Sequence, residues 1–290
     1  MIVFEIVKSL RLKQWIKNLI IFAPLIFSEN VFDRILLLKS VFAFVLFCLV
    51  SGAAYILNDI KDLEEDRLHP LKSKRPLASG RLKKSLALFT FFFLVILSLM
   101  GAFLINIFFC IALGVYLVLQ VSYSFWLKHV VILDVFLIAT GFLIRVIAGG
   151  LVIEVQLSPW LFICTILLAL FLALSKRRHE LILLNESAGI HRPILKEYNP
   201  HLLDQMIAVV TASTVISYCL YTISSETIEK FGTRNLIFTV PFVLYGIFRY
   251  LYLVHQKNEG GSPELLIITD KPLLIDVFLW IATAILIIYI

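Results

Sequence analysis

The sequence predicts an all-α membrane protein, a polytopic bundle of about nine transmembrane helices. Three observations lead to this fold class: 60% of the 290 residues are hydrophobic, the mean hydropathy is +0.96, and only 16% are charged. Soluble domains carry about 25% charged residues, so a soluble globular protein is excluded. Since a helix needs about 20 apolar residues to cross a bilayer, little remains for a second domain, and we expect residues 1–290 to form one integral membrane domain.

Apolar runs bounded by charged residues define the expected spans. The third and fourth spans are joined by almost no loop, which predicts a tight helical hairpin at Ile105–Ile107. The nine predicted spans are 16–32, 35–57, 85–105, 107–126, 130–150, 159–175, 202–223, 235–254 and 272–290.

The distribution of Lys and Arg predicts the orientation of the bundle. The N-terminus and the even-numbered connections, counted with their flanks, hold 21 of these residues, and the odd-numbered connections hold 4. Because cytoplasmic loops carry the excess, we expect a cytoplasmic N-terminus, insertion in the cytoplasmic (inner) membrane and an active site facing the cytoplasm. Residues 1–14 read as an amphipathic helix on the membrane surface, with cations near lipid phosphates. The loops account for the net charge of +6, so no nucleic-acid partner is expected.

Most of the polar chemistry falls in two expected cytoplasmic loops, 58–84 and 176–201. In the first, a continued helix would place Asn58, Asp62 and Asp66 on one face, with Asp59 beside them. Like charges at this spacing repel, and a divalent cation with hard oxygen ligands, such as Mg²⁺, would relieve the conflict. The sequence thus predicts Asn58, Asp59, Asp62 and Asp66 as metal ligands. A solvated acidic helix end, balanced by Lys61 and Arg67, is the alternative.

A basic segment follows the carboxylates, from His69-Pro70 to Gly80. Cations beside a metal-binding face are what a polyphosphate ligand needs, and Arg can bind phosphate oxygens with two parallel hydrogen bonds. We therefore expect Arg67, Lys74 and Arg75 to contact substrate. Anchoring to anionic lipid is the other interpretation of these cations.

The pattern Asn58-Asp59-x-x-Asp62-x-x-x-Asp66 resembles the first signature of the UbiA superfamily of intramembrane prenyltransferases. Most members of that superfamily have a second aspartate motif in the sixth connection, and two Mg²⁺ ions hold a prenyl diphosphate between the motifs. Here the corresponding stretch is Leu174-Ser175-Lys176-Arg177-Arg178-His179-Glu180, with no aspartate before Asp204. A standard prenyl-diphosphate reaction is therefore in doubt.

The departure fits one branch of that superfamily, the polyprenyl-phosphate phosphoribosyltransferases, and the chain is similar to this branch along most of its length. The similar blocks are Gln14-Trp15-Ile16-Lys17-Asn18, the aspartate motif with His69-Pro70 and Arg75-Pro76, Tyr123-Ser124, Leu127-Lys128, Ile144-Arg145, Ala148-Gly149-Gly150, Lys176-Arg177 with Glu180, Pro263-Glu264 and Asp270-Lys271.

This resemblance implies a reaction. A 5-phosphoribosyl group would pass from phosphoribosyl pyrophosphate to a polyprenyl phosphate, and pyrophosphate would leave. Asp59, Asp62 and Asp66 would carry the catalytic Mg²⁺, while Lys176 and Arg177, with Glu180 beside them, would hold the lipid phosphate. Such a phosphate is already an anion, so no general base is required. A lipid-linked pentose for cell-wall synthesis is the product that the branch implies.

Other candidates are weaker. Lys17, Asn18, Tyr123 and Lys128 lie at span ends where they would face substrate or merely the membrane interface. Arg145 lies about 15 residues into its span, and an intramembrane charge is a candidate functional group; a buried structural pair with Asp134 or Glu154 is the alternative. Glu264 and Asp270, near a Gly-rich segment, receive no firm role.

Two other functions compete with this reading. An aromatic prenyltransferase acting on a quinone precursor or haem would share the fold, but it calls for paired aspartates near Lys176. A transporter or channel needs polar residues along several spans, and apart from Arg145 the spans nearly lack charge. The sequence leaves prenyl chain length open, and a homo-oligomer is possible.

Overall fold

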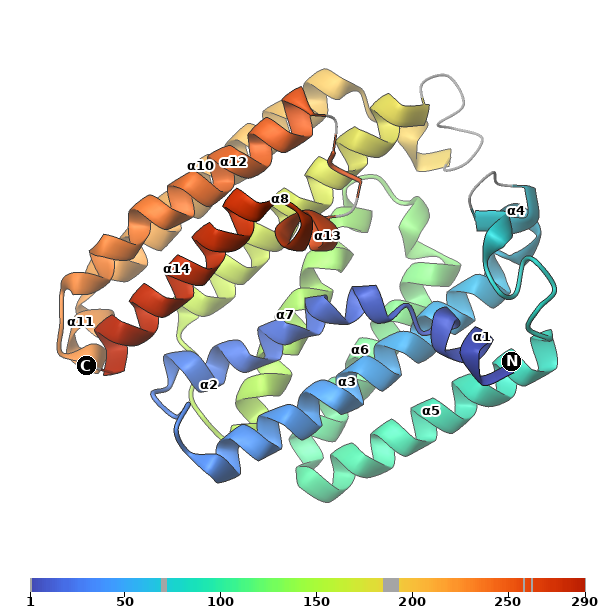
Figure 1. Ribbon diagram of the computed structural model, residues 1–290, viewed down its shortest axis with the longest axis horizontal. Helices are drawn as coiled ribbons and strands as arrows, with labels where there is room; N and C mark the ends of the chain where they lie inside the picture. The colour runs from blue at the N-terminus through green and yellow to red at the C-terminus, as the bar shows by residue number, and fades with distance from the viewer. Residues whose placement is uncertain (1, 69–71, 185–192, 258, 262, 290) are drawn as a thin grey trace. The chain divides into compact units, whose positions relative to one another are not determined.

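The computed structural model describes residues 2–68, 72–184, 193–257, 259–261 and 263–289. Over these residues the chain is helical and contains no β-strand, so the predicted all-α class is confirmed (Figure 1). The chain forms two compact units, Met1–Leu157 and Ser158–Ile290.

Among its described residues, unit 1 contains four long helices and several short elements. The helices α3 (Arg34–Lys61), α5 (Lys84–Ile105), α6 (Ile107–Phe125) and α7 (Leu133–Ile153) are each long and apolar enough to cross a membrane. The shorter elements are α1 (Ile2–Ser9), η1 (Leu12–Phe22), α2 (Ala23–Phe27), α4 (Leu63–Leu68), η2 (Lys72–Lys74) and η3 (Leu127–His129).

Local chemistry sets the ends of these helices. Asp33 caps α3 by accepting hydrogen bonds from the backbone N–H groups of Ile35 and Leu36, at 2.8 and 3.0 Å. Asn106 both ends α5, through its N–H to the Ala102 carbonyl, and begins α6, through its side-chain oxygen. Such caps satisfy backbone groups that a helix end leaves unpaired. The predicted hairpin at Ile105–Ile107 is confirmed.

The predicted span 16–32 takes an unexpected form. Residues 12–27 form a 3₁₀ helix of 11 residues, η1, followed by the 5-residue helix α2. The described residues therefore contain eight helices long and apolar enough to cross a membrane, against the nine spans predicted. A 3₁₀ helix rises about 2.0 Å per residue, against 1.5 Å for an α-helix, so the two elements together cover about 30 Å, the thickness of a bilayer core. The segment runs antiparallel to α3: Asn18 contacts Ser51, and the rings of Phe22 and Phe44 are 5.7 Å apart.

Close packing against α7 accompanies this segment. A Cβ on Gly149 would lie 2.2 Å from the carbonyl oxygen of Ile21, so only glycine fits there. Small residues let helices approach each other closely, and Gly149 of the Ala148-Gly149-Gly150 block does so here.

The described part of unit 2 contains four further helices of spanning length, and η5 (Pro193–Glu197), α11 (Ser225–Phe231) and α13 (Pro263–Thr269) lie between them. The spanning segments are α8 (Pro159–Leu184), α10 (Pro200–Ile223), η6 (Asn235–Thr239) continued by α12 (Val240–Gln256), and α14 (Lys271–Tyr289). Three of these elements are joined by hydrogen bonds, from Trp280 to the Tyr218 hydroxyl at 2.8 Å and between Tyr218 and Thr239 at 2.7 Å. Helix α8 continues to Leu184, about two and a half turns beyond the predicted end of the span at residue 175.

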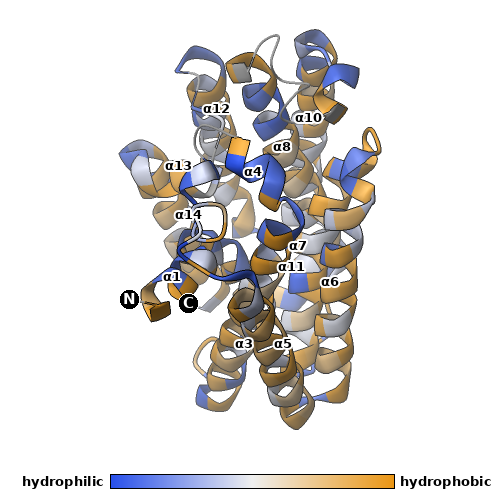
Figure 2. Cartoon of the chain, turned by 90° about the vertical axis from the view of Figure 1, so that its right-hand side faces the viewer, coloured by the Kyte–Doolittle hydropathy of each residue, from blue (hydrophilic) through white to orange (hydrophobic). Residues whose placement is uncertain are grey.

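The exposed side chains of the long helices are those expected of a surface in contact with lipid. Figure 2 shows hydrophobic residues along α3 and α5 and hydrophilic residues on α4. On α5 the large exposed apolar side chains include Phe89, Phe92, Phe93, Ile96, Met100 and Phe103. An apolar surface on this scale is typical of a membrane-facing helix.

Candidate active site

The predicted helical continuation past α3 is present. Asp62 donates its backbone N–H to the Asn58 carbonyl at 2.9 Å, and Asp66 donates to the Asp62 carbonyl at 2.8 Å. The bend between α3 and α4 at Asp62 therefore keeps the helical register. Asn58, Asp62 and Asp66 occur one turn apart, as the sequence predicted.

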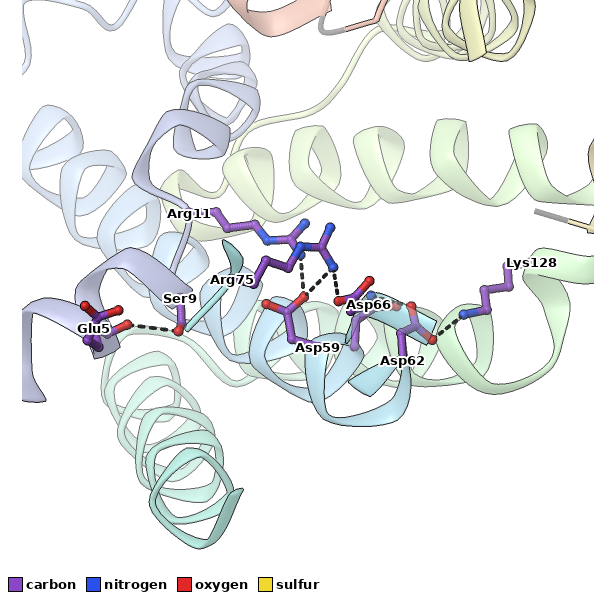
Figure 3. Close-up of polar contacts among 9 residues, drawn as sticks. Glu5, Ser9, Arg11, Asp59, Asp62, Asp66, Arg75 and Lys128 are labelled. Atoms are coloured by element: carbon purple, nitrogen blue, oxygen red, sulfur yellow. Dashed lines mark hydrogen bonds and ion pairs between the residues drawn. The ribbon is translucent and has the colours of Figure 1, made fainter. Parts of the chain in front are cut away.

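Two buried carboxylates share one cation. Arg75 donates from Nη1 to Asp59 Oδ1 at 3.1 Å and from the same nitrogen to Asp66 Oδ2. Arg11 also donates to Asp59 Oδ1. Asp59 and Asp66 are both 2% exposed, and Figure 3 shows the two arginines between α1 and the end of α3. The site thus holds two carboxylate oxygens around a single nitrogen.

The third carboxylate has its own partners. Asp62 accepts a hydrogen bond from Lys128 Nζ at 2.8 Å and from Asn58 Nδ2 at 2.9 Å (Figure 3). Lys128 was predicted from its place at a span end, and η3 brings it to the carboxylates from 66 residues away. The alternative of a solvated acidic helix end is wrong for Asp59 and Asp66, which are buried and paired with Arg11 and Arg75. Of the two cations in that alternative, Arg67 pairs with Glu64 and Lys61 lies over the Phe125 ring.

The donor set fits a hard cation in chemistry. Carboxylate and amide oxygens are the ligands that Mg²⁺ takes in proteins, and Arg75 already bridges two of them as a cation would. Within the described ranges, no group of three or more His, Cys, Asp or Glu side chains is arranged to hold a metal ion. The three carboxylates are instead neutralised by Arg11, Arg75 and Lys128.

Arg11 is the site residue that sequence reasoning missed. It was placed on a surface helix facing lipid phosphates, but α1 ends at Ser9 and Arg11 has a left-handed backbone, with φ 52° and ψ 58°. That turn aims the guanidinium at Asp59 and over the Tyr55 ring, 4.9 Å from its centroid. Left-handed backbone is uncommon for a non-glycine residue, and no signal in the sequence marks it here.

Arg145 lies deeper in unit 1 and is 5% exposed. It donates to the Asn18 side-chain oxygen at 2.7 Å, to the Gly141 carbonyl at 2.7 Å and to the Tyr116 hydroxyl at 2.9 Å. The suggested pairing with Asp134 or Glu154 is therefore wrong. The structure does bring together Asn18 and Arg145, two residues predicted separately.

Unit 2 carries the predicted basic cluster on the last turns of α8. Arg177 is 1% exposed and bonds Glu180 at 2.8 Å, and Arg178 bonds Asp204 of α10. A Cβ on Gly261 would lie 2.8 Å from His179 Nε2, so the glycine segment packs tightly on the same part of α8. Lys176 is half-buried beside them.

The remaining predicted residues are more dispersed. Lys17 and Tyr123 are half-buried, on η1 and α6, and Lys74 is exposed on η2. Asp270 of unit 2 accepts hydrogen bonds from Arg249 at 2.8 and 3.1 Å, and those bonds hold the pKa of its carboxyl below the ordinary 3.8. The His69-Pro70 pair and the Glu264 side chain lie outside the described residues.

The fold and the site together define an integral membrane protein with charged, buried groups at the ends of apolar helices. The chain matches the model of the UbiA prenyltransferase family over residues 19–280. It belongs to that family and is a transferase.

Relatives and solved structures agree with this assignment. A decaprenyl-phosphate phosphoribosyltransferase of Corynebacterium glutamicum is 33% identical, over 98% of this chain and 86% of that protein. The protein of the same name from Mycolicibacterium smegmatis is 32% identical, over 97% of this chain and 92% of that protein. The structure of a UbiA homolog from Archaeoglobus fulgidus bound to DMAPP and Mg²⁺ has a TM-score of 0.75 and 20% identity, covering 99% of each chain.

Proposed function

We propose that this protein transfers a 5-phosphoribosyl group from phosphoribosyl pyrophosphate to a polyprenyl phosphate. The observation that carries the proposal is the near full-length similarity to two proteins named decaprenyl-phosphate phosphoribosyltransferase. In the reaction, the bond between the anomeric carbon and the pyrophosphate oxygen breaks, and a bond from that carbon to an oxygen of the lipid phosphate forms. The products are polyprenyl-phosphoryl-5-phosphoribose and pyrophosphate.

The donor's pyrophosphate is assigned to unit 1. Asn58, Asp59, Asp62 and Asp66 would hold Mg²⁺, which supplies charge neutralisation to the leaving pyrophosphate. Arg11, Arg75 and Lys128 now bond these carboxylates, and each is free to bond a phosphate oxygen once the carboxylates bind a metal. Groups arranged before the reaction to stabilise developing charge are usually the largest source of catalysis.

The acceptor phosphate is assigned to unit 2. Lys176 and Arg177 provide the cations, and the bond from Arg177 to Glu180 fixes the guanidinium. An ionised lipid phosphate attacks without a base, so positioning by these cations is what the step requires. A second acidic cluster would repel the acceptor, which accounts for Lys176-Arg177-Arg178 in this stretch.

The proposed location is the cytoplasmic membrane, with the active site on the cytoplasmic side. The Lys and Arg distribution supports a cytoplasmic N-terminus and a site open to the cytoplasm, where a soluble phosphosugar is available. The lipid product would serve as a pentose donor in cell-wall synthesis.

The first experiment incubates the purified protein in detergent with Mg²⁺, phosphoribosyl pyrophosphate labelled in the ribose, and polyprenyl phosphates of several lengths. Label should move into the organic phase only when Mg²⁺ and a lipid phosphate are both present. A parallel reaction contains a polyprenyl diphosphate and an aromatic acceptor. Product only in that parallel reaction would overturn the proposal in favour of an aromatic prenyltransferase.

A further inference from the structure

A stripe of polar side chains runs along one face of α3, from the bundle interior to the carboxylate cluster. Cys48, Ser51, Tyr55, Asp59 and Asp62 follow one another at spacings of three and four residues, which places them on one face. At 1.5 Å per residue, Ser51 lies about 12 Å along the helix from Asp59.

An arginine lies near each end of this stripe, one in direct contact with it and one connected to it through Asn18. At the outer end, Arg11 bonds Asp59 and lies over Tyr55. At the inner end, Asn18 donates to Cys48 Sγ and Ser51 Oγ, both at 3.2 Å, and accepts from Arg145. Two cationic groups are thus held roughly two helical turns apart along the same polar face.

The inner arginine has neutral partners. Its three hydrogen bonds go to an amide, a carbonyl and a hydroxyl oxygen, and its guanidinium lies 4.7 Å from the Tyr116 ring centroid and 5.3 Å from that of Phe142. Among the residues that the structure describes, no carboxylate pairs with it. A guanidinium has five N–H donors, so two remain after these bonds.

A buried charge without a counter-ion is costly, and within a membrane such a charge is a candidate functional group. Hydrogen bonds to neutral acceptors and ring faces reduce that cost but leave the net charge of +1 in place. An anion that reaches the inner end of the stripe would therefore be bound by a group already oriented by Asn18 and Tyr116.

We propose that Arg145 binds the 5-phosphate of the donor, while the carboxylate cluster, with Arg11 and Arg75, holds the pyrophosphate. This inference rests on the proposed function. Phosphoribosyl pyrophosphate carries anions on opposite sides of a sugar ring, matching two separated cationic groups. A prenyl diphosphate has an anion at one end only, so Arg145 would select a phosphosugar over an isoprenoid donor.

The test compares two donors, phosphoribosyl pyrophosphate and ribosyl pyrophosphate, which lacks the 5-phosphate. A site built to hydrogen-bond a group rejects an analogue without it, and a charged hydrogen bond of this kind corresponds to about a 10- to 100-fold difference in kcat/KM. We expect wild-type protein to prefer the phosphorylated donor by that factor and Arg145→Gln to show almost no preference.

Arg145→Lys gives a second variant, which keeps the charge but not the fork of donors, and its preference should be intermediate. General damage to the fold lowers kcat/KM for both donors equally, so the ratio reports the contact itself. For a variant too inactive to assay, the thermal shift caused by ribose 5-phosphate replaces the ratio; wild type should be stabilised and the variant not.

Two outcomes would overturn the inference while leaving the proposed function intact. One is full preference for the 5-phosphate in Arg145→Gln. The other is a raised KM for polyprenyl phosphate with the donor preference unchanged, which would assign Arg145 to the acceptor. Absence of transfer from either donor by the wild-type protein would instead contradict the proposed function.

Discussion

The charged side chains of the two units are arranged in opposite ways. In unit 1 the motif supplies carboxylates from one short stretch, 58–66, and the neutralising cations arrive from residues 11, 75 and 128. In unit 2 a short stretch of α8 supplies the cations, and the acids are Glu180 beside them and Asp204 of the next helix. One unit therefore offers hard oxygen ligands, and the other offers anion-binding nitrogen donors. This difference is the physical basis for assigning a metal-bound donor to one unit and a lipid phosphate to the other.

The largest effect should come from the carboxylate side. Asp62→Asn keeps the size of the side chain but removes the charge that binds Lys128 and the expected Mg²⁺, so transfer should fall by at least about 100-fold. Glu65→Gln is the matched control, since Glu65 is an exposed acid on α4, the short helix that begins directly after Asp62. The measurement is lipid labelling across a Mg²⁺ titration. Equal losses in the two variants would mean that general acidity, not the site, matters.

The cationic side should respond in a different kinetic constant. Arg177→Gln removes a buried guanidinium, and we expect KM for polyprenyl phosphate to rise about 10-fold or more while KM for the donor stays unchanged. Lys196→Gln, an exposed lysine of unit 2, should leave both constants unchanged. A rise confined to the donor's KM would reverse the assignment of the two units.

A smaller effect should follow from the backbone packing that supports the site in unit 1. Gly149→Ala places a methyl group against the Ile21 carbonyl, and overpacking of this kind costs about 1–3 kcal/mol. Gly114→Ala is its control, because a Cβ there meets nothing within 4 Å and alanine favours a helix. Thermal unfolding in detergent should show a lower Tm for the first variant and an equal or higher Tm for the second.

The smallest effect is electrostatic and lies in unit 2. Hydrogen bonds from Arg249 lower the pKa of Asp270, so the folded state binds this proton more weakly than the unfolded state. The resulting stability is fully present above pH 3.8 and is lost as the pH falls through the lowered pKa. The drop in Tm between pH 6 and pH 3 should be smaller for Asp270→Asn than for the wild-type protein. Both proteins contain the same other acids, so the difference between the two drops reports Asp270. An identical drop in both proteins would show that the ion pair contributes nothing measurable.

Hydropathy was sufficient to predict the long helices, because crossing a bilayer demands an apolar run of fixed length. The face shared by Asn58, Asp62 and Asp66 followed from helical periodicity alone. The cations that bond these carboxylates did not follow from periodicity. Lys128 and Arg75 reach the carboxylates through the tertiary fold, and Arg11 does so through a left-handed turn that a sequence pattern does not reveal. Arg145 was identified as unusual by its depth, but its neutral partners, Asn18 and Tyr116, come from other segments and could not be foreseen.

The backbone form of η1 fixes the reach of Arg11. Its 11 residues are about 5 Å longer as a 3₁₀ helix than they would be as an α-helix. With Ile21 held against Gly149 at one end, conversion to the α form would draw the other end, and Arg11 with it, away from Asp59 by about one helical turn. The 3₁₀ form of η1 therefore determines whether the Arg11 guanidinium can reach Asp59.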